Sequence, residues 1–483
     1  MQIYDIAIIG SGIGGTLFGA LNHTKYDIIL FEKDTNLGGC ASTFKRFDGY
    51  YNSGATTFVG YEEGHIVKDM FDRVGYTPEL IKTPLGLRIV QDGLKVDRVE
   101  DFDTFLEEID RVYPNPNNRD FWYKIKSIDE AFWQLKHIYY AKHSIKSYLK
   151  TLRSVTELAF TFKHHLFVSA TSFIQNILGD ISPEYQAFID AQLLITLQTS
   201  SKELSLLPMA LGLAYPFHDT FYVKGGMGVL IDSLLRDVNV KTKEEIISIK
   251  RQDGLYRLKS NKGEYLAKNV VLNSSIYDSG GLFEDKKIQN YYKKFAFSDQ
   301  SAFVVYLRLK SSKEFLHHYQ IILQDTIPNS ISNAFFVSFS DREDTKMSDK
   351  EGYSITISTH TKASIWRGLT KEEYNAQKEQ TQSYIIEAFL DYFSTIGRED
   401  IIKTFSATAN TFNRYISRSN CGGEALKLKN ILNIPTCTTP FEGLYNVGDT
   451  IFAGQGWAGV ALGVDILDKE DRKSTRLNSS HRL

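Results

Sequence analysis

Two short apolar runs at the start of the chain have the length and spacing of buried parallel strands. The first, Asp5 to Ile9, leads through several glycines into apolar positions with helical spacing from Leu17 to Leu21. The second lies in DIILFEKD and ends on an acidic residue, Glu32. The order strand, turn, helix, strand predicts the beginning of a Rossmann-like α/β domain.

The middle of the chain follows different periods. From Phe121 to Tyr139, apolar residues recur every three or four positions and predict a helix that is rich in aromatic side chains. Such a stripe is either a core-packing face or one wall of a tunnel for an apolar substrate, and the pattern alone leaves both interpretations open. Further on, SAFVVYLRL, YQIIL, NAFFVSF and YSITIST are short and rich in β-branched or aromatic residues, and they predict antiparallel strands beneath a substrate site.

The last apolar pattern, GLYNVGDTIFAGQGWAGVALGVDIL, repeats the order strand, turn, helix. We expect LYNV to return to the first sheet, and a helix from near Ala458 to direct its N-terminus at the same ligand as the first turn. These patterns predict an α/β fold with a Rossmann-like dinucleotide-binding domain, built on a parallel sheet from residues 1–85, 216–276 and 406–470. An α+β substrate domain with a mixed or antiparallel sheet would comprise residues 86–215 and 277–405. The tail, 471–483, loses the apolar period, resembles cloning sequence or a disordered terminus, and is left out of the fold prediction.

Composition and charge narrow the classes of function. The 483 residues suit two domains, and 56 basic against 58 acidic side chains argue against a nucleic-acid binder. The three cysteines lack metal-ligand spacing, so no metal site is predicted, and their odd number fits a reducing compartment. The first residues do not form a signal-peptide pattern, and no segment is apolar enough to cross a bilayer. We therefore expect a cytoplasmic protein that at most lies on a membrane surface.

The glycine turn after the first strand has the spacing of a dinucleotide site. Gly10 permits a tight turn, Gly12 lets the backbone approach a diphosphate, and Gly15 allows close packing of helix on strand. Glu32 stands where an acid binds the ribose hydroxyls of an adenosine, although a glycine-rich turn followed by a chance acid would look similar. Further close-approach turns at residues 38–39 and 54–56 favour the longer cofactor FAD over a nicotinamide dinucleotide.

Five segments, in order along nearly the whole chain, resemble the FAD-dependent carotenoid desaturase and isomerase family of the amine oxidase-like superfamily, which includes phytoene desaturases and C-3',4' desaturases. They are EKDTNLGGCASTFKRFDGYYNSGAT, FYVKGGMGVLIDSLL, HTKASIWRGLTKEEYNAQK, TFNRYISRSNCGG and GLYNVGDTIFAGQGWAGVALG. The resemblance implies an FAD site with these residues: Gly10, Ser11, Gly12, Gly14 and Gly15 at the diphosphate, Glu32 with Lys33 toward the adenosine ribose, Gly38, Gly39, Ala41, Ser42, Gly54, Ala55 and Thr56 along the middle of the cofactor, Ile246 at the adenine, Gly448 and Asp449 at the diphosphate and ribityl chain, and Gln455, Gly456, Trp457 and Ala458 at the isoalloxazine.

Two positions depart from the family pattern. Many relatives carry Arg after the double glycine where this chain has Cys40, and Asp before the Gly-Ala turn where it has Asn52. Charge pairing with the diphosphate is therefore expected from helix dipoles and from Arg46.

The resemblance implies an FAD-dependent oxidoreductase that acts on a polyisoprenoid such as a carotenoid. Desaturation would transfer hydride to the flavin, whereas flavin-assisted cis-trans isomerisation would involve no net oxidation. The flavin itself is the expected catalytic group, since His164, His165 and His360 show no acid or nucleophile partner and are interpreted as structural or surface residues. An acceptor such as a quinone or oxygen would remove the electrons. The sequence leaves the polyene, the choice of reaction, the acceptor and the oligomeric state open.

An apolar substrate also predicts a membrane partner. At about 0.8 kcal/mol per methylene, a long polyene is strongly disfavoured in water. We therefore expect peripheral attachment to the inner face of the membrane, with a tunnel mouth near residues 121–178 or 206–223. Two alternatives remain open, an amine oxidase with an aromatic cage that includes Trp457, and a prenyl-binding escort-like protein without flavin chemistry.

Overall fold

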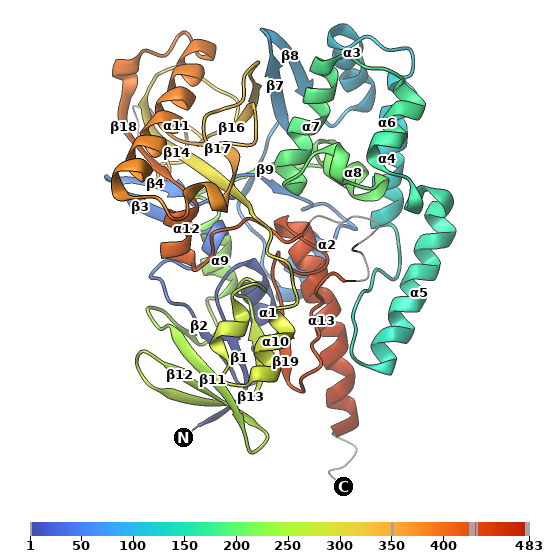
Figure 1. Cartoon of the computed structure of the whole chain (residues 1–483), viewed down its shortest axis with the longest axis vertical. Helices are drawn as coiled ribbons and strands as arrows, with labels where there is room; N and C mark the ends of the chain where they lie inside the picture. Colours follow the sequence, from blue (N-terminus) through green and yellow to red (C-terminus); the bar gives the residue numbers. More distant parts are fainter. Residues whose placement is uncertain (1, 349–351, 425–429, 431–432, 479–483) are drawn as a thin grey trace.

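The computed structural model describes residues 2–348, 352–424, 430 and 433–478, and it contains two large sheets, one toward each end of the molecule (Figure 1). The N-terminal sheet has the strand order β10-β2-β1-β13-β12-β11, with β19 also paired to β13. Three separate stretches of the chain supply its strands: β1 Ile3–Ile9 and β2 Ile28–Phe31; β10 Val240–Lys241, β11 Ile246–Gln252, β12 Leu255–Ser260 and β13 Glu264–Leu272; and β19 Leu444–Asn446. β1, β2, β10, β13 and β19 are parallel, and β11 and β12 form an antiparallel extension.

Helices from both ends of the chain pack together on this sheet. α1 (Ile13–Asn22) contacts α13 (Gly456–Asn478), α2 (Ile66–Val74) and α9 (Gly228–Leu234), while α10 (Lys286–Tyr292) lies beside β19 (Figure 1). The predicted return of the chain to the first sheet and the helix beginning near Ala458 are confirmed by β19 and α13. The backbone of α13 continues to Asn478, beyond the point where the loss of the apolar period predicts its end, and residues 479–483 lie outside the described part of the chain.

The second large sheet has the order β18-β14-β17-β16-β15-β7-β8 and is antiparallel except for the pair β15 and β7. The four segments expected to be strands all belong to it. Its strands are β7 Leu87–Gln91, β8 Leu94–Arg98, β14 Gln300–Lys310, β15 His318–Ile322, β16 Ala334–Phe339, β17 Gly352–Lys362 and β18 Ile401–Ala407. α11 (Lys371–Tyr392) begins at a capping box of Thr370 and Glu373 and buries Ile385 and Phe389 against the sheet. α12 (Ala409–Ile416) follows β18.

A group of helices completes the substrate side of the molecule: α3 Phe102–Val112, α4 Asn118–Trp133, α5 Ile145–Phe162, α6 Ala170–Leu178, α7 Pro183–Leu197 and α8 Leu206–Ala214. The stripe from Phe121 to Tyr139 predicts one helix, but α4 ends at Trp133. The reason lies in α5, because the amides of Lys136, Tyr139 and Ala141 donate to Glu157, Ser154 and Thr151 of that helix. The chain gains these hydrogen bonds by running extended along α5 instead of continuing the helix.

Two small sheets connect the larger parts. One is the hairpin of β3 (Thr43–Arg46) and β4 (Gly49–Asn52), and β4 packs against β17. The other has β9 (Thr220–Val223) between β5 (Phe58–Val59) and β6 (Leu80–Lys82). Within the described residues, every helix is too short or too polar to cross a bilayer.

Candidate functional site

The opening glycine turn lies at the carboxyl ends of the parallel strands. Gly10 takes a positive φ of 98°, and Gly15 lies so close to the carbonyl oxygen of Gly10 that a Cβ would collide with it. α1 has no side-chain cap and no acidic residue in its first turn, so its N-terminal amides keep their partial positive charge for a ligand.

Ser11 and Glu32 are joined directly behind this turn. The backbone amide and the hydroxyl of Ser11 both donate to Oε2 of Glu32, at 3.0 and 2.6 Å, and the same hydroxyl accepts from the amide of Gly38 at 3.0 Å. The other carboxylate oxygen of Glu32 accepts from the amide of Asp34. These bonds hold the acid at the end of β2, and its oxygens still have acceptor capacity for ribose hydroxyls.

The closing glycine turn meets the opening one in space. A Cβ on Gly14 would lie 2.7 Å from the amide nitrogen of Gly448 and 2.7 Å from Oδ1 of Asn273. Asn273 also donates to the carbonyl of Gly10 at 3.3 Å. Sequence reasoning missed Asn273. A signal was present, since Asn273 follows the apolar run of β13 just as Gly10 follows β1 and Val447 follows β19. Parallel strands that pair in register bring such ends to one edge of the sheet.

The double glycine lies against the opening turn. Gly38 and Gly39 have positive φ values of 105° and 56°, and a Cβ on Gly39 would lie 3.9 Å from Cα of Gly12. Ala41 is buried, and the hydroxyl of Ser42 is hydrogen-bonded to that of Ser53. The structure thus brings the second turn to the place where the resemblance implies the middle of a cofactor.

Several other candidate residues are engaged by the protein itself. Lys33 Nζ donates to the carbonyl of Arg414 at 3.3 Å, which ties the end of β2 to α12. Ile246 is buried at the start of β11, two residues beyond Glu244, whose amide donates to the carbonyl of Glu32. The backbone near Ile246 is therefore adjacent to the expected adenosine site.

The two departures from the family pattern have distinct surroundings. Asn52 Oδ1 accepts from Thr43 and from the amide of Met227, so this side chain fixes the Lys-Gly-Gly-Met segment. Burial raises the pKa of the Cys40 thiol, which keeps it protonated.

The isoalloxazine candidates lie at the start of α13. Gln455 Nε2 donates to the carbonyl of Thr196 in α7 at 2.5 Å, which links the closing segment to the substrate side. The ring of Trp457 lies 5.3 Å from that of Phe58 and 5.8 Å from that of Phe71, so it is part of an aromatic core cluster. Trp457 is 4% exposed, which leaves it little surface for an aromatic cage around an amine.

A cavity of about 540 Å³ lies between the glycine-rich segments and the helices and strands of the predicted substrate domain. On one side it is lined by Ile13, Cys40, Gly54, Ala55, Thr56, Asp449, Gln455, Gly456, Trp457 and Ala458. On the other side the lining is mostly apolar and includes Phe132, Trp133, Ile195, Leu204, Leu211 and Phe336. The apolar stripe from Phe121 to Tyr139 is therefore in part a core-packing face and in part a cavity wall. Phe121 and Ile125 are core residues, whereas Phe132 lines the cavity.

An ionic cluster forms a polar part of the cavity wall. His218 is hydrogen-bonded through Nδ1 to Glu62 and through Nε2 to Asp129 at 2.6 Å, and the indole of Trp133 donates to the second oxygen of Asp129 at 3.2 Å. Burial would lower the pKa of His218, but the bonds and charges of Asp129 and Glu62 outweigh it and raise the pKa to about 10. Sequence reasoning missed this cluster, because its three members come from distant segments.

The histidines singled out by sequence differ in their surroundings. Burial lowers the pKa of His360 to about 4, so its imidazole is neutral where it lines the cavity. His164 and His165 lie in the short 3₁₀ segment Lys163–Phe167 after α5.

Comparisons with known proteins agree with this architecture. Residues 8–74 match the model of the NAD(P)-binding Rossmann-like domain. A chloroplastic prolycopene isomerase of Daucus carota is 23% identical over 95% of this chain and 78% of its own length. The crystal structure of an oxidoreductase from Methanosarcina mazei has a TM-score of 0.62 at 16% identity, covering 96% of this chain and 100% of that one. A putrescine oxidase double mutant has a TM-score of 0.61 at 12% identity, covering 98% and 99%.

The fold and the glycine site define the class of protein, an enzyme that uses a flavin or nucleotide cofactor. Within that class, the relatives named prolycopene isomerase agree with the resemblance of the motifs to the carotenoid desaturase and isomerase family.

Proposed function

We propose that this chain is an FAD-dependent enzyme that desaturates or isomerises a carotenoid or a similar polyisoprenoid. The observation that carries the proposal is the cavity that lies between the glycine turns and an apolar wall of helices and strands. A compact polar substrate would leave most of that wall uncovered, whereas a long hydrocarbon matches it. The relatives named prolycopene isomerase support isomerisation as the first activity to test.

The residues that are present fit FAD. Gly12 and Gly14 pack at the N-terminus of α1 against Asn273 and Gly448, where a Cβ would collide with protein atoms. Backbone without side chains at a helix N-terminus favours close approach of a diphosphate. Glu32 would hold the adenosine ribose, and residues 455–458 would lie along the flavin ring. When bound, FAD would supply reversible hydride transfer.

The protein's own contribution is alignment and the exclusion of water. Phe132, Leu211 and Phe336 would hold an extended hydrocarbon by apolar contact. His360 is neutral and His218 has both ring nitrogens engaged by carboxylates, so neither is assigned as a proton donor or acceptor in the reaction.

Neither alternative class fits as well. An amine oxidase would need an aromatic cage beside the flavin, yet the ring of Trp457 packs between Phe58 and Phe71. A prenyl-binding escort protein would not need a helix N-terminus without a side-chain cap or an acidic residue, which is what α1 has.

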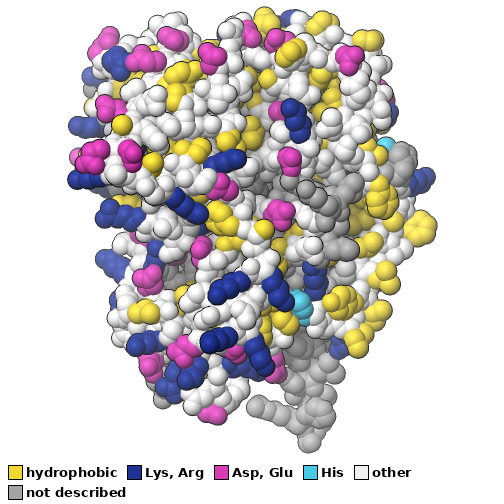
Figure 2. Space-filling model, viewed as in Figure 1, with side chains coloured by type: hydrophobic (Ala, Val, Ile, Leu, Met, Phe, Trp, Pro, Cys, Tyr) yellow, Lys and Arg dark blue, Asp and Glu magenta, His cyan; other side chains and the backbone are white. Residues whose placement is uncertain are grey.

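The surface of α5 supports a membrane partner. Its outward face carries Ile145, Tyr148, Leu149, Leu152, Val155 and Phe160, which are between 48% and 82% exposed, while Ser147 and Ser154 face inward and are buried. The exposed face of α5 is thus rich in large apolar side chains, while two of its three buried residues, Ser147 and Ser154, are polar. An ordinary surface helix has the opposite distribution. Figure 2 shows hydrophobic side chains gathered along this edge of the molecule.

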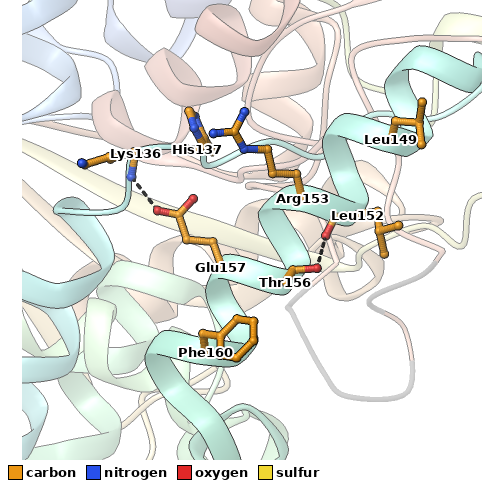
Figure 3. Close-up of a pocket in the computed structure, with 8 residues that line it drawn as sticks. All are labelled: Lys136, His137, Leu149, Leu152, Arg153, Thr156, Glu157 and Phe160. Atoms are coloured by element: carbon orange, nitrogen blue, oxygen red, sulfur yellow. Dashed lines mark hydrogen bonds between the residues drawn. The ribbon is translucent and has the colours of Figure 1, made fainter.

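Basic residues border the same face. Leu149, Leu152 and Phe160 project from α5 around a shallow pocket that Lys136 and Arg153 also line (Figure 3). Apolar side chains flanked by cations suit the interface of a bilayer that contains anionic lipids. We propose that the enzyme lies on the inner, cytoplasmic face of such a membrane.

The proposed membrane face adjoins the cavity. The segment between α4 and α5 packs against the cavity wall, since the ring of Tyr140 lies 5.1 Å from that of Phe452 and Lys142 donates to the carbonyl of Ile434. Phe452 and Ile434 both line the cavity. A hydrocarbon leaving the bilayer near α5 would have a short path to the site, and a membrane quinone or oxygen would be the acceptor for desaturation.

The decisive experiment expresses the chain in a carotenoid-producing host and analyses the pigments by chromatography and mass spectrometry. Isomerisation changes retention and absorption at constant mass, whereas desaturation removes two hydrogens for each new double bond. Flavin-loaded protein that leaves every pigment unchanged, but forms hydrogen peroxide from amines, would replace this proposal with amine oxidation.

A further inference from the structure

We propose that Arg418 is the cation that holds the diphosphate of the dinucleotide cofactor. The inference rests on the proposed binding of FAD. From the sequence, helix dipoles and Arg46 were expected to pair with the charge of the diphosphate, and the inference assigns that role to the buried guanidinium of Arg418. It concerns a residue in the segment after α12, remote in sequence from both glycine turns.

The side chain of Arg418 is held inside the protein with one part of its hydrogen-bonding capacity unused. Nη1 donates to Oδ1 of Asp449 at 2.7 Å, and Nε donates to the carbonyl of Asn420 at 2.9 Å. The side chain is 13% exposed, and its Nη2 is buried without an acceptor among the residues that the structure describes. Leaving a buried donor unpaired costs free energy, so the arrangement favours a ligand that brings an acceptor.

The neighbours of Arg418 place this guanidinium between the two glycine segments. Asp449, its partner, directly follows Gly448, which packs against Gly14. Cys40, one of its electrostatic neighbours, directly follows Gly39, which packs against Gly12. Both Cys40 and Asp449 line the cavity. Arg418 therefore adds a fixed charge beside the helix N-terminus that the glycines leave open.

The charge of Arg418 is secure. Burial acts against the charged form, but the attraction of Asp449 outweighs it and raises the pKa of Arg418 above its ordinary range. A guanidinium has five N–H donors in one plane, so it can keep its bonds to Asp449 and Asn420 and still donate to a phosphate oxygen.

Arg46 has a different position. Its guanidinium lies 5.0 Å from the ring of Phe47 and 4.4 Å from that of Phe405, at the exposed end of β3. These contacts are cation–π interactions with the protein's own aromatic residues. Arg46 thus stabilises the packing of the β3–β4 hairpin. Of the two arginines, Arg418 is the one placed to bind the cofactor.

The test measures FAD binding to apoprotein by flavin fluorescence, together with thermal unfolding without FAD. Arg418→Gln is expected to weaken FAD binding at least about tenfold. Arg414→Gln, which replaces an exposed arginine of the preceding helix α12, is expected to leave FAD binding unchanged. A second substitution, Cys40→Arg, should restore much of the affinity in the Arg418→Gln background, because it returns a guanidinium to the same place.

A double variant separates direct binding from simple neutralisation of Asp449. If Arg418 donates to the diphosphate, Arg418→Gln combined with Asp449→Asn stays weak. Recovery of wild-type affinity in that double variant, or unchanged affinity in Arg418→Gln alone, overturns the inference. Failure of the wild-type protein to bind FAD at all would instead overturn the proposed function.

Discussion

Gly14 and Gly448, from opposite ends of the chain, pack so closely that a Cβ on Gly14 would lie 2.7 Å from the amide nitrogen of Gly448. Contacts below 3.0 Å are not tolerated by a real Cβ, and the opposing atom is backbone that cannot move aside. The two turns can therefore lie this close only while position 14 carries no side chain.

Gly14→Ala is expected to separate the two turns. Overpacking of this kind costs roughly 1–3 kcal/mol, and the flavin content of the purified protein should fall with it. The measurement is the ratio of flavin to protein absorbance, alongside the thermal midpoint. Gly281→Ala is the matched control, since a Cβ there meets nothing within 4 Å. Equal flavin content in the two variants would contradict the shared site.

The local pattern of apolar and polar residues was sufficient to predict the helices and strands in which burial sets the spacing of the apolar residues. β1, β2 and α1 appear as expected, and so do β14 to β17, because apolar runs and alternation report directly which faces are covered. Glycines with positive φ, such as Gly10 and Gly38, were also predictable, since few other residues adopt that conformation.

Relationships between distant segments could not be predicted in the same way. The end of α4 depends on hydrogen bonds that α5 offers to Tyr139 and Ala141, and neither segment carries that information alone. Asn273 and Arg418 gain their importance only when the sheet brings them to the glycine turns. The outward apolar face of α5 also required the structure, because its stripe has the same period as a core helix.

The ionic cluster of His218, Glu62 and Asp129 predicts a pH-dependent contribution to stability. The folded pKa of His218 is raised to about 10 from a usual 6.5, so its stabilisation is complete below about pH 6.5 and is lost as pH rises toward 10. Burial would raise the pKa of Glu62, but its bonds to His218 and Asp219 lower it overall, so its contribution is lost on acidification below its usual value. The cluster should therefore stabilise the folded protein most between the pH at which Glu62 becomes protonated and about pH 6.5, above which the contribution of His218 falls.

His218→Gln is expected to lower the free energy of unfolding by about 3 kcal/mol at pH 6, because two partly buried carboxylates lose their cation. Urea unfolding at pH 6, 8 and 10 checks the sign, since the difference from wild type should shrink as pH rises. His65, which faces His218 at 5.6 Å, has its pKa lowered to about 4 by burial and stays neutral across this range. His23→Gln is a control at a site outside the cluster. A difference that is constant from pH 6 to 10 would show that the imidazolium is not the stabilising species.

Leu211→Trp is expected to narrow the cavity without disturbing the cofactor. Leu211 lines the cavity from α8, and an indole there would occupy space needed by a long hydrocarbon. Conversion of a full-length carotenoid should fall at least about tenfold, equivalent to 1.4 kcal/mol in the barrier, while the flavin spectrum is kept. Leu207→Trp, four positions earlier on α8 and not among the cavity-lining residues, provides the control. Undiminished conversion by Leu211→Trp would place the substrate elsewhere.

The outward face of α5 predicts binding to lipid vesicles. The triple variant combines Leu149→Gln, Leu152→Gln and Phe160→Gln. Each lost apolar side chain would remove on the order of 1 kcal/mol of membrane affinity, so the affinity for vesicles measured by flotation should fall roughly a hundredfold. Lys136→Gln with Arg153→Gln should weaken binding only to vesicles that contain phosphatidylglycerol, and only at low salt.

The control for this prediction separates a specific membrane face from general surface hydrophobicity. Leu94 and Ile402 are 50% and 49% exposed but lie on β8 and β18, away from α5. Leu94→Gln with Ile402→Gln should leave flotation unchanged, because isolated apolar side chains are ordinary on a protein surface and only a contiguous face inserts. If the triple variant floats as well as wild type, α5 is not the membrane face. If the control variant binds vesicles as weakly as the triple variant, membrane attachment is not localised to α5. The expected pattern, loss in α5 alone with flavin content intact, would place the entrance for an apolar substrate where the segment from Lys136 to Lys142 joins that helix to the cavity wall.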